Sequence, residues 1–288
     1  MAVLRAILCD NYNSKSNPMN PVSDTAFYTC GIRARDAESE KSICNDKYAQ
    51  RFMNTRGLEV FAEFSGDKMG SHAHIARHTM IDKRVGARVL ADPKTTVVSI
   101  GAGFDSRAYR THGGRWIELD EPGIVEYKNG RLAPTDCPNE LTRIAINFKT
   151  ECLSERLPNI DPETNVVVVI EGVFFYLTEA QISETLKALR SAYPRHVLIC
   201  DLMTRKFIES RNKKIHKKLQ KMNAPFKFLA DTPSLTFIQA GYRVYERASI
   251  ISRTIALILG SGMASIFSLI MREMAGGYSV YTFEMPDA

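Results

Sequence analysis

Hydrophobic and polar residues follow two different periods along this chain. In four segments the apolar residues recur every three or four positions, as on one face of a helix; these segments are residues 24–35, 46–64, 72–90 and 181–192. Six shorter runs are rich in Val, Ile and Tyr and predict strands; they are residues 95–100, 116–119, 165–170, 196–202, 241–246 and 277–283. Strands that alternate with helices indicate an α/β sheet with right-handed crossovers.

The run N-V-V-V-V-I at residues 165–170 is apolar throughout, which is typical of a strand buried on both faces of a parallel sheet. The composition agrees with a globular protein, since 44% of the 288 residues are hydrophobic and 24% are charged. These values exclude disordered chains, collagen-like repeats and coiled-coil rods. We expect one domain with insertions, or one domain with a small cap.

An uncharged stretch of eighteen residues, 254–271, interrupts the C-terminal part of the chain. Its length is at the lower limit for a membrane span, and its small residues around Gly260 suit close helix packing. A single span would place the last strand across the bilayer from the sheet that it should join. We therefore interpret this stretch as a buried helix, broken at Gly260, that packs on the core or on a partner subunit.

The positive charge of the chain is concentrated in one segment. The formal net charge is +6, but residues 203–228 alone contain nine Lys and Arg against one Glu. The rest is slightly acidic, which argues against a nucleic-acid binder. The interpretation we favour is a solvated helical face; the alternative is attraction of an acidic acceptor, a carrier protein or an anionic membrane surface.

The six cysteines and the N-terminus bear on the compartment. The cysteines are scattered without a C-x-x-C pair, so neither a disulfide framework nor a paired zinc site is indicated. Residues 1–10 lack the apolar length and the cleavage site of a secretory signal. We expect a cytoplasmic protein with reduced thiols.

The most informative segment is the turn Gly101-Ala-Gly103, which joins a predicted strand to a helix that begins near Asp105. Glycines allow a tight turn and let a ligand approach the backbone. Asp120 ends the next strand, where a carboxylate can accept hydrogen bonds from both ribose hydroxyls of a nucleoside cofactor. A dinucleotide fingerprint would need a third glycine where Ser106 stands, so the turn fits S-adenosylmethionine better than NAD.

Seven short sequence motifs follow one another along the chain in a characteristic order. They are S-D-T-A at 23–26, R-A at 33–34, D-K-Y-A at 46–49, A-R-H-T-M-I-D at 76–82, I-G-A-G-F-D-S-R-A-Y-R at 100–110, E-L-D-E-P at 118–122 with Lys128, and I-E-G-V-F-F-Y-L at 170–177. This series resembles the leucine carboxyl methyltransferase family, class I S-adenosylmethionine enzymes, and is most similar to its polyketide carboxyl O-methyltransferase branch. The resemblance runs from about residue 23 to residue 201 and is loose beyond.

The resemblance implies an α/β fold with a Rossmann-like class I methyltransferase sheet. That sheet would be mostly parallel with an antiparallel C-terminal strand, and would carry helical N-terminal and cap insertions. We expect a flexible arm at residues 1–22 and a methyltransferase domain at residues 23–288. The cap insertions are expected at about 203–235 and 249–276.

The resemblance also assigns cofactor-binding roles to five residues near the glycine turn and the adenosyl group. Gly101 and Gly103 match the turn beneath the cofactor, and Asp120 matches the ribose-binding acid. Asn147 and Phe148 stand where the family usually has Asp-Leu against the adenine. Asn147 can still hydrogen-bond the base, though without charge.

Four further residues match positions near the methionine part of the cofactor or the acceptor. Arg77 matches the arginine that pairs with the methionine carboxylate, and Arg33 matches a nearby basic residue. Glu171 matches the glutamate after the fourth strand, and Tyr176 the tyrosine of its E-x-x-x-x-Y phrase. The alternatives are that Arg77 forms a surface pair with the downstream Asp82, that Asp120 merely begins a loop, and that Tyr176 is a packing aromatic.

Three histidines, His72, His74 and His78, belong to one predicted helix. Although His74 and His78 share a face, no H-E-x-x-H pattern follows, and we expect no metal. A polar or substrate-lining role is favoured. His78 and Tyr176 are the candidate catalytic residues.

Taken together, the residues and the resemblance predict an O-methyltransferase of secondary metabolism. The acceptor would be a carboxylate, or another oxygen, of a small-molecule or polyketide-like compound. A carboxylate is ionised at neutral pH and needs no base, whereas a phenol or enol would call for His74 or His78. The alternatives are a protein C-terminal carboxyl methyltransferase, an NAD-dependent oxidoreductase and a non-catalytic nucleoside-binding protein. No nucleic-acid partner is expected, a homodimer is compatible with the apolar stretch, and membrane-surface contact is less favoured.

Overall fold

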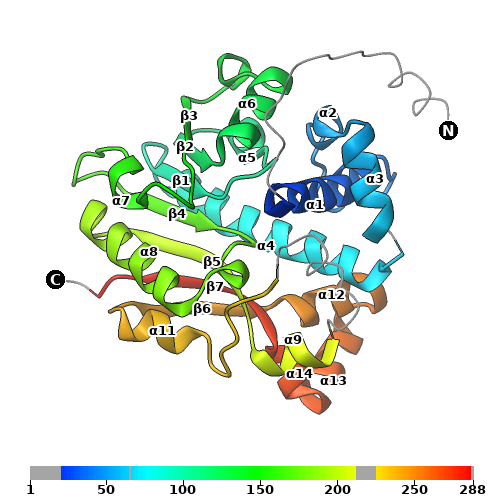
Figure 1. Cartoon of the computed structure of the whole chain (residues 1–288). Coiled ribbons are helices and arrows are strands. Elements are labelled where there is room, and N and C mark those ends of the chain that lie inside the picture. Colours follow the sequence, from blue (N-terminus) through cyan, green and yellow to red (C-terminus); the bar gives the residue numbers. More distant parts are fainter. Residues whose placement is uncertain (1–20, 65, 212–224, 287–288) are drawn as a thin grey trace.

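A seven-stranded sheet forms the centre of the computed structural model, which describes residues 21–64, 66–211 and 225–286. The strands are β1 (Thr96–Ile100), β2 (Arg115–Asp120), β3 (Leu141–Ala145), β4 (Val166–Ile170), β5 (Val197–Met203), β6 (Arg243–Ser249) and β7 (Tyr278–Glu284). Their order across the sheet is β3-β2-β1-β4-β5-β7-β6 (Figure 1). The first five are parallel, and β7 lies antiparallel to β5 and β6. The predicted mostly parallel sheet with an antiparallel C-terminal strand is confirmed.

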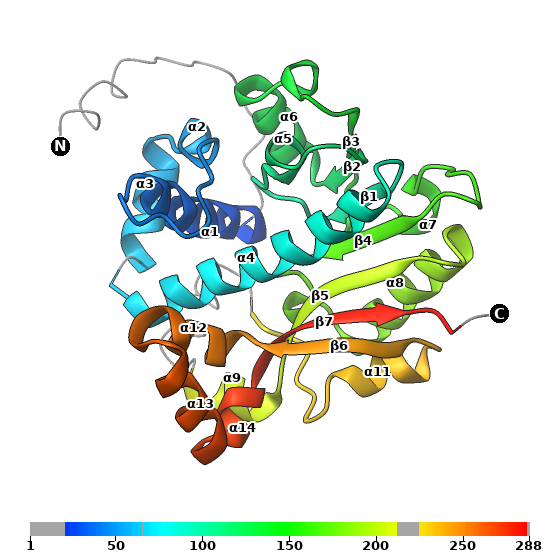
Figure 2. The same cartoon turned by 180° about the vertical axis from the view of Figure 1, so that it is seen from behind.

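Helices cover both faces of this sheet, which explains the continuous apolar strands. Val97, Val167 and Ile199 belong to one core layer, together with buried residues of α1 (Pro21–Ala37) and α4 (Lys68–Ala91). The neighbouring positions Val98 and Val168 belong to a second layer, against α8 (Glu179–Ala192). Figure 2 shows α4 running across one face, with α8 on the far side. Because successive side chains point to opposite faces, every residue of β1 and β4 is buried.

The segment 46–64 is not the single helix that its periodicity predicts. It forms α2 (Ala49–Phe52) and α3 (Thr55–Phe64), separated by Met53 in an extended conformation. The side chain of Asn54 accepts a hydrogen bond from the Gly57 N–H at 2.8 Å, so Asn54 caps the second helix and ends the first. The remaining helices are α5 (Arg107–Arg110), α6 (Pro122–Arg131), α7 (Leu153–Arg156), α9 (Arg205–Arg211), α11 (Ser234–Gln239), α12 (Ile250–Leu259), α13 (Ser261–Ile270) and α14 (Arg272–Gly276).

One strand was not predicted, and two of the predicted segments lie mostly outside the described residues. Strand β3 was not predicted, because this edge strand is only partly buried and its L-T-R-I-A sequence has no apolar run. The expected arm at residues 1–22 and the Lys-rich part of 203–228 lie mostly outside the described residues.

The uncharged stretch 254–271 is broken at Gly260, as predicted, and it is buried only in part: Thr254, Ile255 and Ala264 are buried. Gly260 has φ +92°, a conformation that favours glycine, and separates α12 from α13. The prediction that it packs on the core is wrong for α13, where Ile266, Leu269 and Ile270 are 54%, 66% and 71% exposed. Packing on a partner subunit stays a prediction. No helix within the described ranges is long and apolar enough to cross a membrane.

Candidate active site

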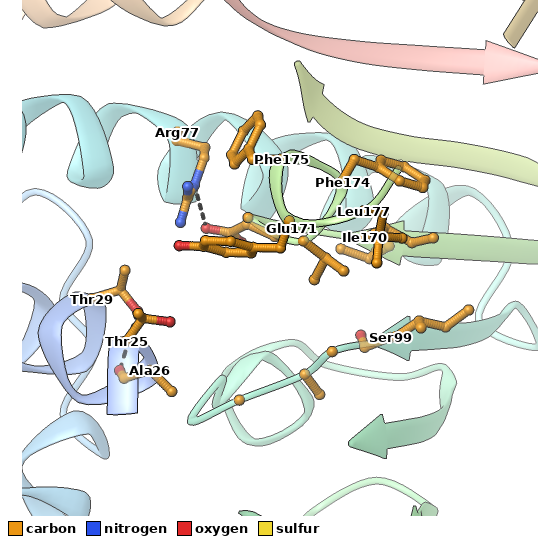
Figure 3. Close-up of a pocket in the computed structure, with 18 of the residues that line it drawn as sticks. Thr25, Ala26, Thr29, Arg77, Ser99, Ile170, Glu171, Phe174, Phe175 and Leu177 are labelled. Carbon is orange, nitrogen blue, oxygen red and sulfur yellow. Dashed lines mark hydrogen bonds and ion pairs between the residues drawn. The ribbon is translucent and has the colours of Figure 1, made fainter. Parts of the chain in front are cut away.

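The carboxyl ends of β1, β2 and β4 open into one cavity of about 970 Å³. Its polar half is lined by the turn after β1 and by the carboxylates that end β2 and follow β4. Its aromatic half is lined by α1, α4, α12 and the segment after β4. Figure 3 shows Thr25, Ala26 and Thr29 of α1 on one side of this cavity, and Arg77 and Glu171 on another. Ligands of open α/β sheets bind at this edge.

The glycine turn is fixed both to the neighbouring strand and to the segment after β4. Gly101 and Gly103 have φ +67° and +47°, which β-branched or bulky residues rarely adopt. The Gly101 N–H donates to the Leu119 carbonyl at 2.9 Å. A Cβ added at Gly101 would lie 2.5 Å from a methyl group of Val173, so the position admits only glycine without a shift. The turn thus exposes backbone, not side chains, to the cavity.

Asp120 ends β2 on the cavity wall and supports the same turn. Its Oδ2 accepts a hydrogen bond from the Gly103 N–H at 2.5 Å, and its Oδ1 accepts one from the Glu121 N–H at 2.7 Å. Burial raises the pKa of Asp120 to about 6, although the two backbone N–H groups offset part of the effect. A carboxylate offers about four lone-pair sites, so Asp120 retains acceptor capacity for two hydroxyl groups.

Arg77 of α4 lies beneath the cavity in a network of charged side chains. Its Nε donates to Glu171 at 2.9 Å, and its Nη1 donates to Asp201 at 3.2 Å and to the Tyr278 hydroxyl at 2.9 Å. Because Arg77 is only 6% exposed, the alternative of a surface pair with Asp82 is wrong. Among the bonds of the described residues none uses Nη2 of Arg77, which leaves this nitrogen for a ligand.

Arg107 of α5 is the most highly connected cation of the network. Its guanidinium donates to Asp82, to Asp105 at 2.8 Å and to Glu171 at 2.6 Å. Burial opposes the charge of Glu171, but the guanidinium groups of Arg107 and Arg77 outweigh it and hold the pKa of that carboxyl well below its usual range. Glu171 is therefore a permanently ionised group at the cavity floor.

His78 is enclosed by Arg107 and Arg110. Its Nδ1 lies 2.9 Å from Nη2 of Arg107, and its Nε2 lies 2.9 Å from Nη2 of Arg110. The residue is 2% exposed. A neutral imidazole accepts at one nitrogen only, so one arginine can donate to the ring while the other nitrogen carries its N–H near Asp82 or Glu171, at 3.7 and 3.6 Å. This enclosure by charged groups favours a positioning role over contact with an acceptor.

His74, one turn earlier on α4, is differently placed. Its ring lines the cavity and packs edge-on against Tyr28, with 5.1 Å between ring centroids. Within the described part of the chain, Nδ1 of His74 is buried without a hydrogen-bond partner. Burial, assisted by Arg77, lowers the pKa of His74 to about 3, so the imidazole is neutral at pH 7. The described residues contain no group of three or more His, Cys, Asp or Glu that could hold a metal ion.

The other predicted cofactor residues flank the polar half. Arg33 is 7% exposed and lines the cavity; its Nε donates to Asp46 at 2.9 Å and its Nη2 to the Phe104 carbonyl at 2.7 Å. Phe148 is 38% exposed and also lines the cavity. Asn147 lies beside the lining residues, and its side-chain oxygen accepts a hydrogen bond within its own turn.

The aromatic half contains Tyr176, in the segment after β4. Its ring packs against Phe226, with 5.7 Å between centroids, and burial raises the pKa of its hydroxyl. Ile251 and Ile255 of α12 add aliphatic surface. Other aromatic residues that line this half include Tyr28, Phe175, Phe207, Phe267 and Tyr278.

Sequence reasoning missed Arg107, Asp201 and Tyr278. Asp201 lies in β5 next to the strand that precedes Glu171, so its place near the carboxyl edge was a usable signal. Arg107 stands within the quoted phrase at 100–110, but its partners come from distant segments. Tyr278 reaches the site from the last strand, which no local pattern indicates.

A family model described as leucine carboxyl methyltransferase matches residues 26–190. TcmP of Streptomyces glaucescens, an O-methyltransferase of tetracenomycin polyketide synthesis, is 25% identical over 256 residues, which cover 85% of this chain and 92% of TcmP. A Saccharopolyspora erythraea protein assigned as an S-adenosyl-L-methionine-dependent methyltransferase is 26% identical over 57% of this chain and 61% of its own length. A similarly assigned protein of Mycobacterium tuberculosis is 25% identical over 54% of this chain. Apart from TcmP, the matched region spans only about half to three fifths of these relatives' length.

Two solved structures share the fold. A DUF574 family protein from Streptomyces avermitilis superposes with a TM-score of 0.58 at 11% identity, covering 90% of this chain and 97% of that protein. Magnesium protoporphyrin IX methyltransferase from Synechocystis, solved with bound SAH, has a TM-score of 0.50 at 14% identity, covering 84% of this chain and all of that protein. At these identities the likeness establishes the architecture alone.

Proposed function

The chain belongs to the leucine carboxyl methyltransferase family. On this premise we propose that it transfers the methyl group of S-adenosylmethionine to an oxygen atom of a small-molecule acceptor. The acceptor oxygen we favour is that of a carboxylate. The observation that carries the proposal is the division of the cavity. Its polar half joins a glycine turn to two carboxylates, and this half opens directly into an aromatic chamber. A charged nucleoside and an apolar acceptor would thereby meet inside one enclosed site.

The polar half fits the donor chemically. Asp120 retains acceptor capacity for the two ribose hydroxyls, and the exposed backbone of the turn at Gly101 admits the adenosyl group. Phe148 offers an apolar surface for the base. The free guanidinium nitrogen of Arg77 suits the methionine carboxylate, and the ionised Glu171 suits its ammonium.

Methyl transfer from this donor asks little acid–base chemistry of the protein, since the bound sulfonium supplies an already activated methyl group. The side chains then have to align the acceptor oxygen and exclude water. A base of pKa about 3, such as His74, is a poor proton acceptor at pH 7. This supports an acceptor that is already ionised, with His74 and Tyr176 orienting it and His78 positioning the arginines.

The lining of the aromatic half supports an aromatic, polyketide-like acceptor over a protein C-terminus. Its residues are mainly Phe, Tyr and Ile, whereas an extended peptide would need polar partners for its backbone. The likeness to TcmP, which covers most of both chains, supports the same class.

Calorimetry and product analysis test the proposal. We expect the protein to bind S-adenosylmethionine and not NAD. Asp120→Ala should weaken that binding at least about 100-fold, since two hydrogen bonds to a charged group are worth about 1.5–3 kcal/mol each. The exposed Asp136→Ala serves as the matched control and should bind like the wild type.

With methyl-labelled donor and a panel of aromatic carboxylic acids, the product should be an ester that alkali cleaves to labelled methanol. An alkali-stable methyl ether would move the acceptor to a hydroxyl group. Absence of donor binding, or tight NAD binding, would contradict the proposal.

A further inference from the structure

The break at Gly260 creates an exposed apolar surface that the site does not use. We call it the apolar ridge; its residues are 39–71% exposed, and they are Ile258, Leu259, Met263, Ile266, Leu269, Ile270 and Met271. Met263, Ile266 and Ile270 recur at helical spacing on α13, so they form one stripe. A contiguous apolar surface of this kind is uncommon on a soluble monomer and indicates a binding surface.

The ridge lies at the edge of the molecule, away from the sheet. Figures 1 and 2 show α13 and α14 at the same extremity from opposite sides, next to α9. The inner side of the same helices is different, because Ile251, Ile255 and Phe267 line the aromatic half of the cavity. One pair of helices therefore separates the cavity from the exposed ridge.

Within the segment that carries the ridge, the charged side chains are all cations. Residues 250–272 contain Arg253 and Arg272 and no Asp or Glu. Both arginines are exposed, and neither forms an ion pair with the described residues. The nearest acid in sequence, Glu273, is neutralised by Lys206 of α9. The surface thus combines an apolar stripe with flanking cations, the combination that binds anionic lipid surfaces.

We propose that the apolar ridge docks on an anionic lipid bilayer, with Ile266, Leu269 and Ile270 among the acyl chains and Arg253 and Arg272 at the headgroup phosphates. A second copy of the chain is a poorer occupant, because a two-fold contact between ridges would bring four arginines together, while the adjacent Glu273 already pairs with Lys206. The proposal is independent of the proposed function. It would place the wall of the aromatic half against the membrane, where apolar acceptors concentrate.

Vesicle flotation of the full chain tests this inference. The wild type should float with phosphatidylcholine vesicles that contain phosphatidylglycerol, and much less with phosphatidylcholine alone. The triple variant Ile266→Gln, Leu269→Gln, Ile270→Gln should reduce the bound fraction at least about tenfold, since three apolar side chains lose their burial in lipid. The double variant Arg253→Gln, Arg272→Gln should reduce binding about tenfold on the anionic vesicles only.

A matched control is the double variant Leu235→Gln, Ile238→Gln on α11, where the two side chains are 50% and 46% exposed. It should float like the wild type. Wild-type protein that stays with neither vesicle overturns the proposal, as does an equal loss in the α11 control. A dimer in size-exclusion chromatography that only the triple variant abolishes, without vesicle binding, would assign the ridge to a second copy. Calorimetry with S-adenosylmethionine should give the same affinity for all variants, so failure here is distinguishable from failure of the proposed function.

Discussion

In the polar half of the cavity the glycine turn and the carboxylates stand at the ends of adjacent strands, and arginines of α4 and α5 hold the carboxylates in buried ion pairs. In the aromatic half the side chains come from segments distant in sequence and are held by packing. Arg77, Arg107 and Glu171 illustrate the first case, because each contacts at least two charged partners. Tyr176 and Phe226 illustrate the second, since they meet through their rings.

Because of this difference, the two halves should differ in how many amino-acid substitutions they tolerate. A buried charge whose partner is removed is strongly destabilising, so the polar half tolerates few substitutions. Apolar packing tolerates exchange of side chains of similar volume. The same fold can therefore keep one donor site and present different acceptor surfaces, and the comparison can be tested on each half separately.

The largest effect is expected for Arg107→Met in the polar half. The substitution leaves Asp82, Asp105 and Glu171 without their shared cation. We expect the free energy of unfolding, measured with urea, to fall by about 3–5 kcal/mol. The matched control is Arg195→Met, which removes an exposed pair with Glu163 and should change the stability by less than about 1 kcal/mol. Equal effects in the two variants would show that the network does not hold this half together.

The polar half could be predicted from sequence for a physical reason. Gly101, Gly103, Asp120 and Glu171 all follow strands, and parallel strands bring their carboxyl ends to one edge. The local sequence pattern is therefore enough to predict that these residues lie close together. The partners of Arg107 could not be found in the same way, because they come from α4 and from the segment after β4.

The aromatic half and the ridge show where sequence reasoning fails. An uncharged stretch such as 254–271 predicts burial, but hydropathy does not tell which side of a helix another element covers. Only Ala264 of α13 is buried, whereas Leu269 and Ile270 are exposed. The prediction of a single helix at residues 46–64 is wrong at Asn54. The side chain of Asn54 caps a new helix there, although the apolar periodicity continues through this position.

The next effect concerns pH. Burial raises the pKa of Asp120 to about 6, against partial compensation by the Gly103 and Glu121 N–H groups. Donor binding needs the carboxylate, so the affinity for S-adenosylmethionine should be constant above pH 6 and fall about tenfold per pH unit below it. The stability of the free protein should respond in the opposite direction. Because the folded state binds the extra proton of Asp120 between about pH 4 and pH 6, the contribution of Asp120 to the unfolding free energy should decrease as the pH rises through that window.

Calorimetry at several pH values and urea unfolding of the free protein measure the two trends. The Asp120→Asn variant is the reference: its donor affinity should not fall in this way below pH 6, and the difference in unfolding free energy between the two proteins at each pH gives the contribution of Asp120. If the wild-type affinity stays constant down to pH 5, the group that binds the ribose is not Asp120 in this protonation state.

The smallest effect is expected in the aromatic half, for His74→Phe. Phenylalanine keeps the edge contact with Tyr28 but removes the unpartnered Nδ1. We expect kcat/KM for a carboxylate acceptor to fall about fivefold, the value of one neutral hydrogen bond, with unchanged donor affinity. Since the pKa of His74 is about 3, the pH profile between pH 5.5 and pH 8 should not change. His72→Phe on the same helix is the matched control, because its ring bonds the Lys68 carbonyl instead of lining the cavity. If His74→Phe instead removes a step in the profile near pH 7, His74 acts as a base, the acceptor is a hydroxyl group, and the aromatic half takes part in proton transfer as well as in packing.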